Sequence, residues 1–261
     1  MKEDIRIVFT DIDCTIFDHS RPPSRFDKHS INELKRIQKK GIKVFLCTAR
    51  PYHSLAEIKL LDLFQPDGMI LANGGLVIVG DKVIYRTTMT SKLFEEVCEV
   101  ALEYGANIEG IRTYDCFLIK EADKAVHELF ATYPEEIPPV EDYHNQDVYG
   151  LTLFVHKDLD QYIRPRLSQL LYYFRYHDYG VDVAEVPHVK GEGIKIVLDY
   201  LGISKENAMA IGDDLADISM FDEVRFGVAM GNAKDEVKDS STHITKTVTK
   251  HGVKSILRKL L

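Results

Sequence analysis

The chain of 261 residues contains no tryptophan and no run of about 18 apolar residues that could span a membrane. Its first ten residues, MKEDIRIVFT, lack the long apolar segment of a secretory signal. Only four cysteines are present, and no two of them have the CxxC spacing of a metal or redox motif. We therefore expect a cytoplasmic protein with reduced thiols and no membrane partner.

Positive charge is also scarce. Lysine and arginine total 33 against 41 aspartates and glutamates, which gives a net charge of −8 and a pI near 5.7. This balance argues against nucleic acid as a partner. It does not exclude a small phosphorylated ligand, which needs only a local positive site. The apolar content of 45% is that of an ordinary globular protein, and the length allows one large or two smaller domains.

The N-terminal part alternates between predicted strands and helices. Strands are predicted at 5–10, 42–47 and 68–72, and a helix at 30–41, where apolar residues recur at helical spacing before Gly41. This β-α-β order predicts a parallel sheet with helices on its faces. Ligands of such sheets bind beyond the carboxyl ends of the strands.

The pattern changes after a hairpin predicted at 76–86. The middle third reads as a small α+β unit. Its strands are expected near 107–111, 114–119, 148–155, 172–177 and 182–186, its helices near 91–105, 122–132 and 157–170, and a Pro-rich acidic connector at 133–146. The α/β pattern returns with a helix at 193–203 and strands at 207–214 and 225–230. We therefore predict an α/β protein with a Rossmann-like parallel-sheet core, residues 1–80 and 187–261, and an inserted α+β domain, residues 81–186.

Aspartates follow two of the predicted core strands. Asp11 and Asp13 end the strand at 5–10, Asp213 ends the strand at 207–214, and Asp217 lies one helical turn later. Buried charges are costly unless they are paired or hold a metal. Mg²⁺ suits such a group because it prefers carboxylate, water and phosphate oxygens. The alternative is that these aspartates only cap helices at the ends of loops.

Two further residues could bind an anion. Lys190, in HVKGEGIK, lies at the predicted start of a helix, where a cation opposes the helix dipole. Together with Gly191 and Gly193 it favours an anion site at a helix N-terminus, although a solvated lysine in a flexible turn is the alternative. Thr48 ends an apolar strand, and its hydroxyl could donate to a phosphoryl oxygen.

The segments DIDCT, CTAR, Lys190 and GDDLAD occur in the order of the four motifs of haloacid dehalogenase-like (HAD) phosphatases, which the whole chain resembles. The segments HVKGEGIKIVLDYLGI, AIGDDLADISMF and GVAMGNA are similar to the Cof-type subfamily of sugar phosphatases. The insertion between Thr48 and Lys190 resembles the large C2-type cap, of the C2B class, which would carry substrate choice. Each motif alone is a weak signal, but the ordered set is specific.

The resemblance implies a phosphatase of small phosphorylated metabolites, with sugar phosphates as the first candidates. Asp11 would be the nucleophile that forms an aspartyl-phosphate, and Asp13 the general acid and then the general base. Thr48, Ala49 and Lys190 would bind and neutralise the phosphoryl group.

The resemblance also implies a metal cofactor, Mg²⁺, with Mn²⁺ as the open alternative. Asp11 and Asp213 would bind it directly, Asp13 through its backbone carbonyl, and Asp217 through water.

Substrate contacts are predicted at three arginine or asparagine positions. Arg50 and Asn73 lie at the ends of core strands, and Arg175 lies in the aromatic segment LLYYFRYHDYG at 170–180. The alternative for this segment is that its aromatic residues fill the core of the inserted domain.

Two positions depart from the family. Cys14 stands where glycine is usual in the family, and Ala216 stands where asparagine is usual, so we expect slower turnover. A separate hypothesis is that oxidation of the Cys14 thiol, beside the nucleophile, inhibits the enzyme. A phosphomutase, or a phosphate-binding relative with weakened catalysis, remains possible. A receiver-type signalling domain is disfavoured by the length of the chain, and a dehalogenase by the presence of Asp13. The oligomeric state is not predicted.

Overall fold

The structure is a computed structural model that describes residues 4–20, 22–132, 136–142, 147–169, 171–185 and 189–261. The chain divides into two compact units. Unit 1 comprises Met1–Arg50, Leu61–Tyr85 and Val189–Leu261, and unit 2 comprises Pro51–Leu60 and Arg86–His188. Unit 1 extends past the expected boundary near residue 80, and residues 51–60 fall in unit 2. The expected boundary at 187 and parts of the connector at 133–146 lie outside the described residues.

Unit 1 is built on a mostly parallel sheet, as the sequence predicts. Within the described residues this sheet has eight strands in the order β15-β14-β13-β1-β4-β5-β6-β7. Their bounds are Ile7–Thr10 (β1), Lys43–Cys47 (β4), Gly68–Leu71 (β5), Leu76–Val79 (β6), Lys82–Arg86 (β7), Ala208–Gly212 (β13), Phe226–Ala229 (β14) and His243–Ile244 (β15). Strands β15 to β5 are parallel, and β6 is antiparallel to β5. The α/β fold class is therefore confirmed, and the carboxyl ends of β1, β4 and β13 lie at one edge.

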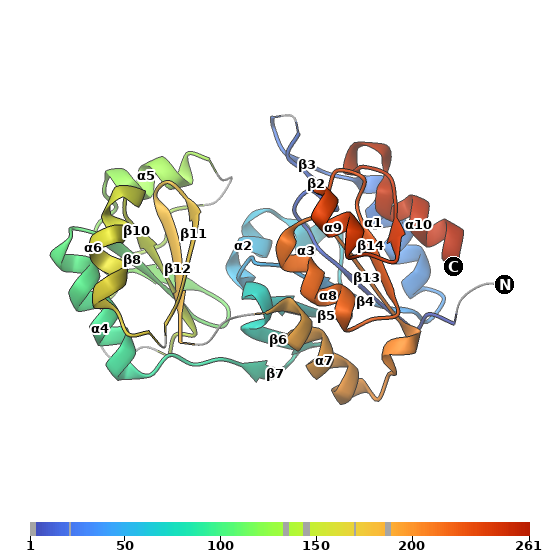
Figure 1. Cartoon of the computed structure of the whole chain (residues 1–261), viewed down its shortest axis with the longest axis horizontal. Coiled ribbons are helices and arrows are strands. Elements are labelled where there is room, and N and C mark those ends of the chain that lie inside the picture. The colour runs from blue at the N-terminus through green and yellow to red at the C-terminus, as the bar shows by residue number, and fades with distance from the viewer. Residues whose placement is uncertain (1–3, 21, 133–135, 143–146, 170, 186–188) are drawn as a thin grey trace. The chain divides into compact units, whose positions relative to one another are not determined.

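Helices cover both faces of this sheet (Figure 1). On one face α1 (Lys28–Gln38) packs with α10 (Gly252–Leu260), and Arg258 Nε lies 3.1 Å from Glu33 Oε2. On the other face α7 (Lys190–Leu201) and α8 (Ile218–Asp222) share an apolar cluster with the strands. Shorter elements of unit 1 are β2 (Phe17–Asp18), β3 (Arg25–Phe26), α3 (Leu60–Leu63) and α9 (Asp235–Asp239).

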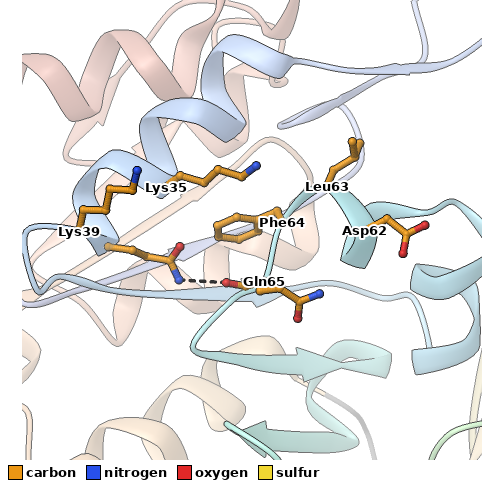
Figure 2. Close-up of a pocket in the computed structure, with 7 residues that line it drawn as sticks. Lys35, Lys39, Asp62, Leu63, Phe64 and Gln65 are labelled. Carbon is orange, nitrogen blue, oxygen red and sulfur yellow. Dashed lines mark hydrogen bonds between the residues drawn. The ribbon is translucent and has the colours of Figure 1, made fainter.

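A shallow surface pocket lies beside α1 (Figure 2). It is lined by Lys35, Gln38, Lys39, Asp62, Leu63, Phe64 and Gln65. A hydrogen bond of 3.1 Å from Gln38 Nε2 to the carbonyl of Gln65 crosses it. None of the predicted site residues lines this pocket, so it does not bear on the chemistry considered below.

Unit 2 is an α+β unit. In the part of the chain that the structure describes, its antiparallel sheet has five strands in the order β11-β12-β10-β8-β9. The elements are α2 (Tyr52–Glu57), α4 (Ser91–Glu103), β8 (Asn107–Ile111), β9 (Cys116–Leu118), α5 (Lys124–Phe130), β10 (Gly150–Phe154), α6 (Asp160–Ile163), β11 (Tyr172–His177) and β12 (Gly180–Ala184). Side chains of α4 and α6 pack on one face of the sheet in an apolar cluster that includes Val97, Ile108, Leu153 and Ile163.

Three expectations in unit 2 are corrected. The last strand runs from Gly180 to Ala184, two residues earlier than expected. The helix expected at 157–170 is broken into short pieces because Pro165 cannot continue a helix, and residue 170 lies outside the described residues. Strand β11 lies at the sheet edge, with Phe174 and Tyr176 exposed, so the aromatic segment does not simply fill a core. No helix among the described residues has the length and apolar character needed to cross a membrane.

The second face of the unit 2 sheet carries a row of polar side chains. Thr152 on β10 pairs with Glu109 on β8 and with Asp182 on β12, so the three residues share one face. Thr152 Oγ1 donates a hydrogen bond of 3.2 Å to Asp182 Oδ1. Burial raises the pKa of the Asp182 carboxyl to about 7, and the hydrogen bond from Thr152 opposes this shift.

This pKa predicts how stability depends on pH. Between the ordinary pKa of 3.8 and about 7, folded Asp182 keeps a proton that the unfolded chain loses, so its contribution to stability falls as pH rises through that window. We expect the free energy of unfolding in urea to fall more between pH 5 and pH 8 in the parent than in Asp182→Asn. Asp158→Asn, at an exposed position, is the control and should follow the parent. Equal pH slopes in the parent and in Asp182→Asn would contradict the prediction.

Candidate active site

The carboxyl ends of neighbouring core strands bring the predicted site residues together. Asp11 follows β1, and its N–H donates to the carbonyl of Ile211 on β13 at 2.9 Å. Thr48 follows β4, and its N–H donates to the carbonyl of Ile70 on β5 at 2.9 Å. Asp213 follows β13, the strand that pairs with β1. The parallel register therefore places the motifs from distant parts of the sequence at one edge of the sheet.

Lys190 supplies a buried positive charge at this edge of the sheet. Its Nζ donates to Asp11 Oδ1 at 2.7 Å and to Asp217 Oδ1 at 2.6 Å, and only 4% of its side chain is exposed. Burial opposes the charged form of Lys190, but the carboxylates of Asp11 and Asp217 outweigh it and raise its pKa well above the ordinary value. The alternative of a solvated lysine in a flexible turn is therefore wrong.

The glycines beside Lys190 have a packing role. A Cβ on Gly191 would lie 2.3 Å from the carbonyl oxygen of Ser219 on α8. A Cβ on Gly193 would lie 2.4 Å from Ile70 Cγ2 on β5. Close packing of the first turn of α7 therefore accounts for both glycines, which the sequence analysis associated with anion binding. The same packing carries Lys190 into the buried site.

Three carboxylates form a cluster that could hold a metal. Asp11, Asp213 and Asp217 each offer an oxygen, and these oxygens all lie within 4.8 Å of one another. Burial, and after it the charge of Asp217, raises the pKa of Asp213 to about 7. Burial also raises the pKa of Asp11, while Lys190 opposes that shift. A hard divalent cation would relieve this repulsion, and the all-oxygen donor set fits Mg²⁺.

Asp217 is wholly buried and both of its oxygens are engaged. While Oδ1 accepts from Lys190, Oδ2 accepts the N–H groups of Asp213 at 2.8 Å and Asp214 at 3.0 Å. A Cβ on Gly212 would lie 2.3 Å from this Oδ2, so the preceding strand must end in glycine. Asp217 thus holds the loop that carries Asp213 and also orients Lys190.

Asp213 has two partners that the sequence analysis missed. Thr15 Oγ1 donates to its Oδ1 at 3.1 Å, and Asn232 Nδ2 lies 3.3 Å from its Oδ2. Asn232 Nδ2 also donates to the carbonyl of Cys14 at 3.0 Å, which ties the first motif to the loop after β14. Thr15 is the last residue of DIDCT, and Asn232 lies in GVAMGNA. Both segments carry the family resemblance, but the sequence alone assigned no role to these two side chains.

Asp13 has partners of its own. Arg50 donates to it twice, from Nε to Oδ2 and from Nη2 to Oδ1, both at 2.9 Å. His19 Nε2 lies 2.7 Å from Asp13 Oδ1, and His19 Nδ1 lies 2.8 Å from Ser24 Oγ. Burial raises the pKa of Asp13, but the hydrogen bonds and charges of His19 and Arg50 outweigh it and hold the pKa well below its usual range. Arg50, predicted to contact substrate, therefore also positions Asp13, and His19 is a residue that the sequence analysis missed.

The backbone conformation of Cys14 explains why the family usually has glycine at this position. Its φ is +56°, in the left-handed region that glycine adopts at least cost. Burial, followed by the charges of Asp213, Asp13 and Asp11, raises the pKa of the thiol to about 12. Because the thiolate is the reactive form, this environment disfavours the hypothesis that Cys14 is an oxidation switch. Ala216 is exposed, and its carbonyl accepts a hydrogen bond of 2.9 Å from Ser219 Oγ.

The remaining predicted core residues line the end of β4. Thr48 is wholly buried, and its Oγ1 accepts the N–H of Arg50 at 3.1 Å, which leaves the hydroxyl proton to donate. Ala49 is exposed directly after it. Asn73 has a φ of +54°, its N–H donates to the carbonyl of Thr48 at 3.0 Å, and its buried Oδ1 has no hydrogen-bond partner among the described residues.

Arg175 has a structural role in unit 2. Its guanidinium donates to Asp160 through Nε at 2.9 Å and also through Nη2. Its Nη1 donates to the carbonyls of Val155 at 2.8 Å and His177 at 3.1 Å. These contacts hold β11 to the neighbouring loops and occupy the guanidinium, so the prediction of a substrate contact at Arg175 is not supported.

Removal of the buried cation should destabilise unit 1. In Lys190→Met the carboxylates of Asp11 and Asp217 lose their shared partner, and we expect a loss of about 3–5 kcal/mol in the free energy of unfolding. Lys195→Met, at an exposed position of the same helix, is the matched control and should stay within about 0.5 kcal/mol of the parent. Urea unfolding at pH 7.5 with EDTA measures both, and similar values for the two variants would refute the role assigned to Lys190.

Comparison with known proteins agrees with this geometry. The sequence pattern of the haloacid dehalogenase-like hydrolases matches residues 8–257. Phosphoglycolate phosphatase 1 of Saccharolobus solfataricus is 28% identical over 257 residues, which cover 98% of this chain and 96% of that protein. The 5-amino-6-(5-phospho-D-ribitylamino)uracil phosphatase of Bacillus subtilis is 26% identical over 98% of each chain. The solved structure of a hypothetical protein from Geobacillus kaustophilus is 28% identical and matches 98% of each chain with a TM-score of 0.89. The chain therefore belongs to the haloacid dehalogenase-like hydrolases and is a phosphatase.

Proposed function

We propose that the protein is a Mg²⁺-dependent phosphatase that hydrolyses small phosphorylated metabolites through an aspartyl-phosphate on Asp11. One observation carries this proposal: the buried Lys190 touches Asp11 at the end of β1, within a cluster of carboxylates that includes Asp213 and Asp217. A nucleophile, a positive charge and a metal-binding group are the parts that phosphoryl transfer needs.

The metal would be held by residues of unit 1. The carboxylates of Asp11 and Asp213 and the backbone carbonyl of Asp13 are the proposed ligands, and Asp217 would contribute through water. When bound, Mg²⁺ would neutralise charge on the phosphoryl oxygens and orient the group. Thr15 and Asn232 would keep the carboxylate of Asp213 in place through the hydrogen bonds described above.

The reaction would proceed in two displacements at phosphorus. An oxygen of Asp11 forms a bond to phosphorus while the bond to the ester oxygen breaks. Asp13, once it has left Arg50 and His19 and taken up a proton, gives that proton to the departing alkoxide. Asp13 then takes a proton from water as that water attacks phosphorus, which releases phosphate and restores the carboxylate of Asp11. Thr48 and Lys190 would hold the phosphoryl oxygens, together with the N–H of Ala49.

Substrate choice is proposed at the level of a class. The two phosphatase relatives are named for phosphoglycolate and for a phosphorylated ribitylamino-uracil, which are both small phosphate esters of different shape. We therefore infer a small phosphorylated metabolite as the substrate and keep sugar phosphates as the first candidates. Arg50 and Asn73 are the proposed contacts in unit 1, the latter because its buried Oδ1 offers an acceptor. The four free cysteines support a reducing cytoplasmic location.

Phosphate release from a panel of sugar phosphates, phosphoglycolate and an aryl phosphate tests the proposal. We expect release with Mg²⁺, loss of release with EDTA, and a fall of about 10³-fold or more in kcat for Asp11→Asn, because the amide cannot act as the nucleophile. Asp222→Asn, at an exposed end of α8, is the control and should retain the parent's rate.

Two other outcomes would redirect the proposal. Isomerised sugar phosphate without free phosphate would identify a phosphomutase. Binding of phosphate by the folded protein without turnover of any ester would identify a phosphate-binding relative, with Cys14 and Ala216 as the positions to restore first.

A further inference from the structure

A second cluster of possible metal ligands lies in unit 2, outside the site described above. It consists of His53 on α2, Glu109 on β8 and Cys116 on β9, each of which offers one ligand atom within 4.8 Å of the others. Glu109 is 7% exposed and Cys116 is 6% exposed. The side chains of Glu109 and Cys116 share a hydrogen bond, and a metal ion would take the place of that contact.

The sheet of unit 2 fixes two of the three residues. Cys116 pairs with Ile111 across β9 and β8, and Glu109 lies two residues before Ile111, so Glu109 and Cys116 point from the same face. Their neighbours Ile108 and Phe117 belong to the apolar cluster of the helix-covered face. Glu109 and Cys116 therefore lie on the opposite face, beside Thr152 and Asp182 and next to the apolar cluster that Leu118 forms with α5, and the paired strands hold them close together.

The distance from His53 to Glu109 fits two ligands of one ion. His53 Nε2 lies 3.6 Å from Glu109 Oε1, which is too long for a hydrogen bond. Two atoms bound at about 2.0–2.2 Å to one tetrahedral zinc lie roughly 3.3–3.6 Å apart. A set of one nitrogen, one sulfur and one oxygen is also what Zn²⁺ accepts, whereas the all-oxygen cluster in unit 1 suits Mg²⁺.

Tyr149 provides a second, independent observation beside this cluster. It is 1% exposed, and its phenol oxygen has no hydrogen-bond partner among the described residues. Burial raises the pKa of this phenol, and the nearby charges of Glu109, Asp182 and Cys116 raise it further. A buried hydroxyl without a partner among acidic groups is costly, and a cation or its bound water would satisfy it.

We propose that His53, Glu109 and Cys116 bind one Zn²⁺ ion in unit 2, with the fourth position left to Tyr149 or to water. On binding, the thiol of Cys116 releases its proton to solvent and the thiolate sulfur forms the bond to zinc. The imidazole of His53 binds as the neutral base and Glu109 as the carboxylate. This ion is separate from the Mg²⁺ of the proposed reaction, so the inference does not depend on the proposed function.

Zinc titration of the full-length protein in excess Mg²⁺ tests the site, with bound metal measured by mass spectrometry after gel filtration. We expect one Zn²⁺ per chain in the parent and about 100-fold weaker binding in Cys116→Ser and in His53→Gln, since each removes a ligand. Cys98→Ser, at another buried cysteine of unit 2, is the matched control and should bind like the parent. Circular dichroism and the rate with an aryl phosphate show that each variant is folded.

Cobalt gives a second measurement that reports the sulfur directly. Co²⁺ in the parent and in Cys98→Ser should show a thiolate-to-cobalt charge-transfer band, and Cys116→Ser should not. Absence of stoichiometric zinc in the parent would overturn the proposal and leave the three residues as a hydrogen-bonded group. Zinc that persists in Cys116→Ser but disappears in Asp213→Asn would place the ion in the carboxylate cluster of unit 1 and would also overturn it.

Discussion

The contact of the buried Lys190 with both Asp11 and Asp217 is the interaction on which the rest of the site depends. Without this cation, the carboxylates of Asp11, Asp213 and Asp217, which come from two sequence segments, would repel one another at one edge of the sheet. Several features of the fold serve this contact. Glycines at 191 and 193 let the first turn of α7 approach α8 and β5, and Gly212 leaves room for the side chain of Asp217. The packing of unit 1 and its chemistry therefore rest on the same few positions.

Sequence patterns predicted the parts of this arrangement that follow from short segments. Helical spacing and strand ends predicted that Asp11, Thr48, Lys190 and Asp213 would lie together, and the structure brings them to one edge because parallel strands share the direction of their carboxyl ends. The pattern could not show that Arg50 binds Asp13 or that Asn232 reaches Asp213, because those contacts join residues far apart in sequence. The contacts of Arg175 with Asp160 and with the carbonyl of Val155 could not be predicted for the same reason, since those partners lie on other elements.

The two units present donor sets of different chemistry. Unit 1 gathers carboxylate oxygens around a lysine, which suits a hard ion and a phosphate ester. Unit 2 places an imidazole, a thiol and a carboxyl group together at the second face of its sheet, a set that suits a softer ion. Cysteine spacing gave no sign of this second group, because its members come from α2, β8 and β9 and not from one short motif. Only the strand register shows that Glu109 and Cys116 share a face.

Covalent trapping measures whether Asp11 receives the phosphoryl group. The parent would be mixed with a substrate that it turns over in Mg²⁺, quenched in acid within the first turnovers, and digested for mass spectrometry. We expect a phosphoryl adduct on the peptide that contains Asp11. It should be confined to that residue and should be lost when the quench is delayed until the substrate is exhausted. Rapid turnover without any adduct, or an adduct on a different residue, would contradict it.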